Sequence, residues 1–144
     1  IYAEFSPPML DERGRALVAT APCERHECGA WMVSDLLERA GWSVRYLGAD
    51  TPGNDLVKAV RDFEPDLVAL SLTMPTNLAR LKCLIQRIRN ECGDDDVHPK
   101  ILVGGQAFTL GSNLWKAVGA DGAAADADKA VAQARRWFGE GRAA

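Results

Sequence analysis

A carboxylate and an imidazole, Glu24 and His26, stand two residues apart in a polar stretch and could act together on a metal. A carboxylate that hydrogen-bonds one ring nitrogen of a histidine fixes the tautomer of the ring and makes the other nitrogen a better metal ligand. One histidine cannot hold a bare divalent ion, but it can supply an axial ligand to a metal that a macrocycle already holds. Ser71 ends a neighbouring predicted strand, so we expect a relay from the Ser71 hydroxyl to Glu24 and on to His26.

Two consecutive glycines, Gly104 and Gly105, follow another predicted strand. Because glycine has no side chain, this pair would open a slot in which a flat ring or a tail approaches the backbone. Each feature also has a plainer interpretation: a lone loop histidine is often only solvated, two glycines often make a turn, and Ser71 can cap the next segment. Their coincidence at one edge of a sheet favours a binding site.

The elements that must position these residues alternate along the chain. Apolar runs predict strands over residues 16–21, 42–47, 67–72, 100–103 and 122–125. Helical spacing predicts helices over residues 29–40, 54–63, 78–92, 112–118 and 128–138. We expect Asn54 to cap the second helix and Pro65 to stop it.

Five strand–helix units predict an α/β protein with a flavodoxin-like (Rossmann-like) five-stranded parallel sheet, order 2-1-3-4-5, and helices on both faces. In such a sheet, ligands bind beyond the carboxyl ends of the strands, at the switch point between strands 1 and 3. Three parts of the predicted site fall at this edge: the loop that holds Glu24 and His26, the strand end with Ser71, and the two glycines.

Composition limits the class of protein. The chain has 144 residues, 47% of them hydrophobic, and its 17 basic and 20 acidic side chains give a formal net charge of −3. These values predict one domain with one core and no direct contact with nucleic acid, which would need a basic surface. No apolar run approaches the roughly 18 residues of a membrane span.

The four cysteines predict a reduced, cytoplasmic setting, and their spacing around His26 matches no zinc pattern. Because the sequence begins with Ile1 rather than Met, we expect a fragment of a longer protein. We divide it into an N-terminal arm or linker (1–13), a ligand-binding domain (14–139) and a C-terminal tail (140–144).

Several familiar uses of this fold do not match the sequence. There is no phosphate-binding loop, and only Gly29 follows the first strand, where a dinucleotide fingerprint needs three glycines. The first loop is charged, whereas a flavin phosphate loop would be rich in serine and threonine. Ser71 stands where a phospho-acceptor receiver needs an aspartate.

The remaining pattern, Glu24-x-His26-x-x-Gly29, then Ser71-x-Thr73, then Gly104-Gly105, resembles the cobalamin (vitamin B12)-binding domain family. The family motif is Asp-x-His-x-x-Gly, then Ser-x-Leu/Thr, then Gly-Gly, and the match covers about residues 14–139. The sequence departs from the motif at Glu24, whose extra methylene would reach the imidazole from a different angle.

The resemblance implies that His26 replaces dimethylbenzimidazole as the lower cobalt ligand, with Glu24 and Ser71 tuning it. The displaced nucleotide tail would run beside Gly104 and Gly105. The cofactor-binding residues that the resemblance implies are Glu24, His26, Gly29, Leu47, Gly48, Ser71, Leu72, Thr73, Gly104, Gly105, Phe108 and Gly122.

Three features are similar to the sensory branch of that family, which includes light-responsive transcriptional regulators. They are glutamate at position 24, residues 46–52 and Gly105-x-Ala107-Phe108. The first hypothesis is therefore a non-enzymatic sensory module that carries adenosylcobalamin, methylcobalamin or hydroxocobalamin. It would regulate transcription through a fused or partner signalling or DNA-binding protein, and a homo-oligomer is left open.

Two alternatives stay open beside the sensor. The first is a corrinoid carrier domain of a B12-dependent methyltransferase or mutase, in which the cobalt performs the chemistry and the domain presents it. The second is a haem-binding sensor of the same fold, with Cys23 or Cys28 as a soft second ligand.

Overall fold

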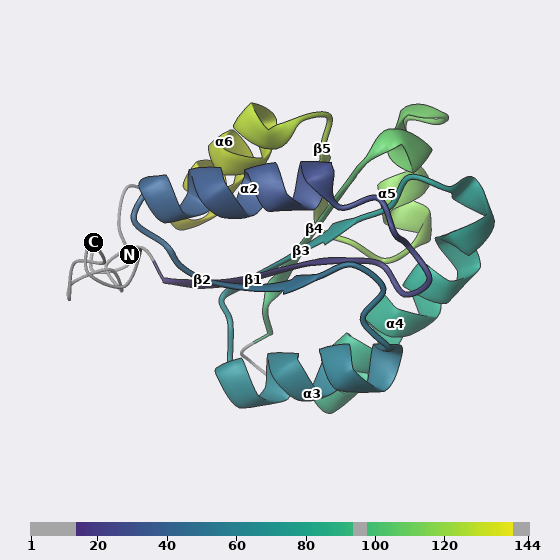
Figure 1. Ribbon diagram of the computed structural model, residues 1–144, viewed down its shortest axis with the longest axis horizontal. Helices are drawn as coiled ribbons and strands as arrows, with labels where there is room; N and C mark the ends of the chain where they lie inside the picture. The colour runs from purple at the N-terminus through teal and green to yellow at the C-terminus, as the bar shows by residue number, and fades with distance from the viewer. Residues whose placement is uncertain (1–13, 94–97, 140–144) are drawn as a thin grey trace.

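A computed structural model describes residues 14–93 and 98–139 and shows a five-stranded parallel sheet between two layers of helices (Figure 1). The strands lie in the order β2-β1-β3-β4-β5. The predicted fold class and strand order are therefore confirmed. The predicted N-terminal arm and C-terminal tail lie outside the described residues. The strands are β1 (Arg15–Thr20), β2 (Ser43–Gly48), β3 (Leu67–Ser71), β4 (Lys100–Gly104) and β5 (Gly122–Ala124).

Helices α2 and α6 cover one face of the sheet, and α3 and α4 cover the other (Figure 1). The ends of every predicted helix and strand lie within two residues of the observed ones. No helix among the described residues is both long enough and apolar enough to cross a bilayer. The helices are α2 (Cys28–Arg39), α3 (Gly53–Phe63), α4 (Leu78–Glu91), α5 (Leu114–Ala117) and α6 (Ala127–Phe138), with short 3₁₀ turns η2 (Pro75–Asn77) and η3 (Gln106–Thr109).

The ends of α3 differ from the prediction. The cap position is Pro52, which makes no side-chain cap, so the predicted capping role of Asn54 is wrong. Instead, Asn54 lies inside the helix and accepts a hydrogen bond from Arg87. At the other end, Glu64 adopts a left-handed conformation with φ of 51°. Pro65 contributes to this ending, because a proline disfavours the right-handed helical conformation of the residue before it.

The sheet separates two cores because successive strand residues point to opposite faces. On β1, Leu17 and Ala19 belong to the core under α3 and α4, whereas Ala16 and Val18 belong to the core under α2 and α6. Small side chains, including Ala69 on β3, populate the second core near the carboxyl ends of the strands. Side chains therefore fill less of the space between the carboxyl ends of the strands and helices α2 and α6.

Candidate functional site

The loop between β1 and α2 is anchored through the backbone of Glu24. The Glu24 N–H donates to the carbonyl of Ala21 at 3.0 Å, and the Glu24 carbonyl accepts from the Asp50 N–H at 2.9 Å. The buried hydroxyl of Thr20 donates to the same Glu24 carbonyl at 3.1 Å. The end of β1 and the loop after β2 therefore both hold Glu24 in place.

The Glu24 carboxylate is buried, with the residue only 1% exposed, and is fully hydrogen-bonded. Oε2 accepts from the backbone N–H groups of Thr73 at 2.9 Å and Met74 at 3.2 Å. Oε1 accepts from the His26 backbone N–H at 3.1 Å and lies 2.7 Å from His26 Nδ1. Burial alone would raise the pKa of this carboxyl, but the hydrogen bonds from Thr73, His26 and Met74 together outweigh burial and hold the pKa below its usual range.

The His26 ring is exposed to solvent, and its contact with Glu24 determines which ring nitrogen carries the proton. Because an ionised carboxylate only accepts hydrogen bonds, the Nδ1 that faces Glu24 carries a proton. In the neutral ring, Nε2 is then the nitrogen with a free lone pair. The His26 side chain is 67% exposed, and Nε2 has no hydrogen-bond partner among the described residues. The ring can therefore offer Nε2 to a metal that comes from outside the protein.

Within residues 14–93 and 98–139, no group of three or more metal-binding side chains could hold a bare ion. The role of His26 as one ligand of a metal that a macrocycle already holds therefore stays a prediction.

The first link of the predicted relay is wrong. In the described part of the chain, the Ser71 hydroxyl makes no hydrogen bond, and backbone N–H groups just beyond β3 take the place expected for it. Ser71 lies on the strand face that belongs to the α2/α6 side, as Ala69 does. Its hydroxyl therefore faces a cavity rather than the carboxylate.

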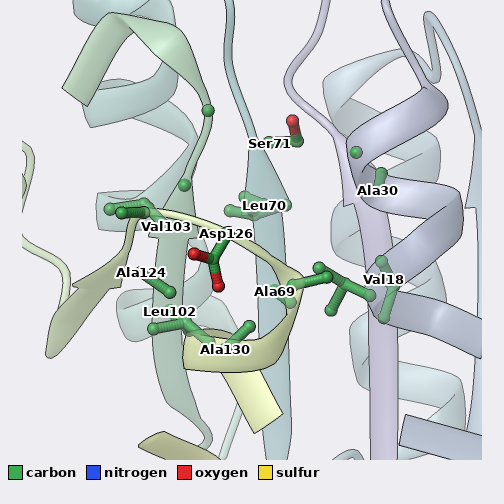
Figure 2. A pocket seen from close by; sticks show the side chains of 16 residues that line it. Val18, Ala30, Ala69, Leu70, Ser71, Leu102, Val103, Ala124, Asp126 and Ala130 are labelled. Carbon is green, nitrogen blue, oxygen red and sulfur yellow. The ribbon is translucent and has the colours of Figure 1, made fainter. Parts of the chain in front are cut away.

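This cavity, of about 120 Å³, lies between the carboxyl ends of β1, β3, β4 and β5 and the helices α2 and α6 (Figure 2). Four predicted site residues line it: Gly29, Ser71, Gly104 and Gly105. The remaining lining residues are Val18, Ala30, Val33, Ala69, Leu70, Leu102, Val103, Ala124, Ala125, Asp126, Ala127 and Ala130.

At two predicted site positions, the fold itself favours glycine. Gly105 has φ of +107°, and an added Cβ would overlap the carbonyl of Leu72. At Gly122, an added Cβ would lie 2.9 Å from the Trp137 ring, and Gly122 is not part of the cavity lining. The packing of Trp137 therefore favours glycine at this position, and the predicted place of Gly122 near a nucleotide tail stays a prediction.

The other predicted site residues lie away from the cavity. Leu72 is fully buried in the core on the α3/α4 face, and Leu47 and Phe108 pack against that core. The carbonyl of Gly48 accepts a long hydrogen bond of 3.4 Å from Thr20. Thr73 contributes its backbone N–H to Glu24 rather than its side chain.

The sequence analysis did not identify most of the residues that line the cavity, although some of them could have been predicted. Val18, Ala69 and Leu102 stand in register on adjacent strands, and each lies two residues before the edge. The period of two in a strand puts such residues on the same face as the edge residues. The hydrogen bond from the Met74 N–H could not be predicted, because a backbone N–H donor does not depend on the residue type.

The sequence matches the family model described as the B12 binding domain over residues 14–134. It is similar to the dimethylamine corrinoid protein of Methanosarcina barkeri, with 32% identity over 111 residues that cover 76% of this chain and 50% of that protein. The chain spans about half the length of the curated relatives it matches, such as this one.

Two solved structures have a similar fold. A cobalamin-binding protein from Desulfitobacterium hafniense DCB-2 has 26% identity and a TM-score of 0.78, and the match covers 87% of this chain and 59% of that chain. The monomethylamine corrinoid protein of Methanosarcina barkeri has 25% identity and a TM-score of 0.76, with 90% and 60% covered.

Proposed function

Because the chain belongs to the B12-binding domain family, we propose that it holds a corrinoid and presents it to a methyltransferase as a carrier domain. The observation that carries this proposal is the Glu24–His26 pair, which offers a free imidazole nitrogen in the loop after β1. An apolar cavity lies at the same carboxyl edge of the sheet. The corrinoid proteins among its relatives favour the carrier over the light-responsive sensor that the sequence suggested, and a corrin over haem.

The residues present fit a corrinoid whose nucleotide tail has left the cobalt. His26 would ligate the cobalt through Nε2, since Nδ1 is engaged by Glu24. The cavity beside Ser71 and Gly104 would take the tail, because its wall is made mainly of small apolar side chains. A bound corrinoid supplies a cobalt centre for methyl transfer, which the side chains of this domain do not supply themselves.

The role of the chain itself is positioning. Glu24 holds the Nδ1–H, so the ring keeps one tautomer and Nε2 stays available. The same carboxylate is tied to the chain just after β3 through Thr73 and Met74, so the ring is oriented before any ligand arrives. Without this support, the exposed ring would lose side-chain freedom on binding, at a cost to affinity.

The test is a titration of the chain with hydroxocobalamin, followed by ultraviolet–visible absorbance. The chain has two histidines, so His98→Ala is a matched control for His26→Ala. We expect the parent and His98→Ala to show the spectrum of cobalt with its own base displaced and a protein histidine bound. His26→Ala should lose this spectral change. If His26→Ala retained it, the ligand assignment would be refuted.

A light-responsive sensor is the second candidate, and the observation that favours it is Glu24 in place of the family aspartate. A sensor must change a protein contact when its ligand changes. Size-exclusion chromatography of the adenosylcobalamin complex, before and after illumination, separates the two candidates. A carrier elutes at the same volume in both states, whereas a shift on illumination would favour the sensor.

A further inference from the structure

Helix α2 presents a tryptophan between two carboxylates on its outer surface. The Trp31 residue is 57% exposed, and the neighbouring Met32 is 51% exposed. Glu27 lies four residues before Trp31 and Asp35 four residues after it, so these three side chains share one face of the helix. We call these three residues the α2 stripe. Exposed apolar side chains with a polar rim are typical of a surface that contacts another protein.

A groove of about 330 Å³ lies where α4 meets the start of α3 and the loop after β1. We call it the α4 groove. Arg80 and Arg87 line it from positions two helical turns apart on α4, with Leu84 between them in the sequence. Pro22, Ala79 and Cys83 complete its mainly apolar wall. The groove thus combines an apolar surface with two guanidinium groups.

The charges of the α4 groove and the α2 stripe are opposite. Of the basic residues on α4, Arg87 and Arg89 have carboxylate partners. Arg80 is exposed, donates a hydrogen bond to Cys23 Sγ and has no carboxylate partner among the described residues. Glu27 is also exposed and forms no ion pair within the described part of the chain. Each surface therefore carries one charge that is left without a counter-charge.

The spacing of the two surfaces also agrees. Glu27 and Trp31 are four residues apart on α2, and Arg80 and Leu84 are four residues apart on α4. If the two helices lie side by side and parallel, an indole over Leu84 brings the Glu27 carboxylate next to Arg80. The indole would also lie between two guanidinium groups, and tryptophan is the aromatic side chain that attracts such cations most strongly.

Helices α2 and α4 cover opposite faces of the sheet, so one chain cannot bring its own stripe to its own groove (Figure 1). We propose that the α2 stripe of one copy docks in the α4 groove of a second copy. Because each copy uses a different surface, the contact is heterologous and can extend to further copies. This inference goes beyond the proposed function and does not depend on it, because the contact needs no corrinoid.

Sedimentation equilibrium of the chain without corrinoid tests the proposal. A reducing agent is present, because Cys23, Cys28 and Cys83 are exposed and could otherwise form disulfides between copies. We expect the average mass to rise above that of one chain as the concentration increases to about 1 mM, since small interfaces bind weakly. The rise should shrink between about 0.02 M and about 0.5 M salt. A parent chain that stays monomeric throughout would overturn the proposal.

Single substitutions test each surface separately. Trp31→Ala removes the indole of the stripe, and Arg80→Glu reverses a charge of the groove. We expect each to weaken association by at least about tenfold. Met32→Ala and Lys82→Glu are the matched controls, because they change exposed residues of the same two helices outside the stripe and the groove. Association of Trp31→Ala or Arg80→Glu with the affinity of the parent would overturn the proposal.

A mixture of the two variants gives the sharpest test. Trp31→Ala keeps an intact groove and Arg80→Glu keeps an intact stripe, so one contact can form between them and none can extend it. We expect each variant alone to be monomeric and an equal mixture to form a dimer and nothing larger. A mixture that stays monomeric at the concentrations at which the parent associates would overturn the proposal.

Circular dichroism establishes that the variants are folded, and Glu27→Arg is a second variant of the stripe if Trp31→Ala is not. Glu27→Arg should weaken association, and the double variant with Glu27→Arg and Arg80→Glu should restore it, because the ion pair is then reversed. Absence of this rescue would overturn the pairing. If the parent is monomeric and still shows the histidine-bound spectrum with hydroxocobalamin, only this inference fails. If it associates but lacks that spectrum, only the proposed function fails.

Discussion

Replacement of Glu24 by alanine removes the carboxylate that joins the His26 loop to the end of β3. The residue is 1% exposed, so water cannot take over all of its contacts. Its Oε2 accepts from the Thr73 and Met74 N–H groups, and its Oε1 accepts from the backbone and ring of His26. We expect Glu24→Ala to destabilise the domain even when no corrinoid is present.

The size of the loss follows from the donors that become unpaired. A buried donor without a partner costs about 1–3 kcal/mol, and the Thr73 and Met74 N–H groups are partly buried in this position. Partial access to water places each near the lower end of that range, so the two together cost about 2–4 kcal/mol. The exposed His26 ring adds little to this sum, because water can hydrate Nδ1.

The assay is urea unfolding at pH 7, followed by circular dichroism at 222 nm. Glu27→Ala is the matched control, because Glu27 is exposed and makes no side-chain cap on α2. We expect the control to change the free energy of unfolding by less than about 0.5 kcal/mol. If Glu24→Ala also stayed within about 0.5 kcal/mol of the parent, the carboxylate would not anchor the loop, and the reasoning would be refuted.

Two further outcomes follow from the same contacts and backbone angles. Because hydrogen bonds lower the folded-state pKa of Glu24, its contribution to stability is present above the usual carboxyl pKa of about 4.3 and is lost as the pH falls through the folded value. Urea unfolding between pH 6 and pH 3 should therefore show a shallower acid loss for Glu24→Gln than for the parent, and identical slopes would contradict this. Gly105→Ala should lower the free energy of unfolding by at least about 3 kcal/mol, because the added Cβ would have a positive φ and would lie 2.9 Å from the Leu72 carbonyl carbon. Gly48→Ala should lower it by about 1–2 kcal/mol, because Gly48 has φ of +81° but open space around it. Equal losses in thermal unfolding would show that the contact with Leu72 is unimportant.

The alternation of strands and helices was predictable because burial leaves a strong pattern in the sequence. The run from Leu67 to Leu70 is 0–6% exposed and is flanked by helices on both faces, so every position along it must be apolar. The pairing of Glu24 with His26 was also predictable, since two residues in one short loop have few ways to be far apart. Local patterns of this kind decide the elements and the contacts within a loop.

The partners of Glu24 beyond its own loop were not predictable. Ser71 was the obvious choice by residue type, but strand alternation turns its side chain into the α2/α6 cavity. The N–H groups of Thr73 and Met74 are the partners instead, and any residue except proline could supply them. Gly105 was interpreted as part of a slot, and it does line the cavity, but its positive φ is what demands glycine.

One strand end therefore positions both parts of the site. Ser71, the last residue of β3, lines the cavity, and the N–H groups of Thr73 and Met74, two and three residues later, hold the carboxylate that orients His26. A shift of this strand end would move the cavity wall and the imidazole together. Glu24 makes this bridge with both of its carboxylate oxygens engaged. In the proposed carrier, the positions of the metal ligand and of the tail would therefore be set by the fold before a corrinoid binds, which would lower the ordering cost of binding.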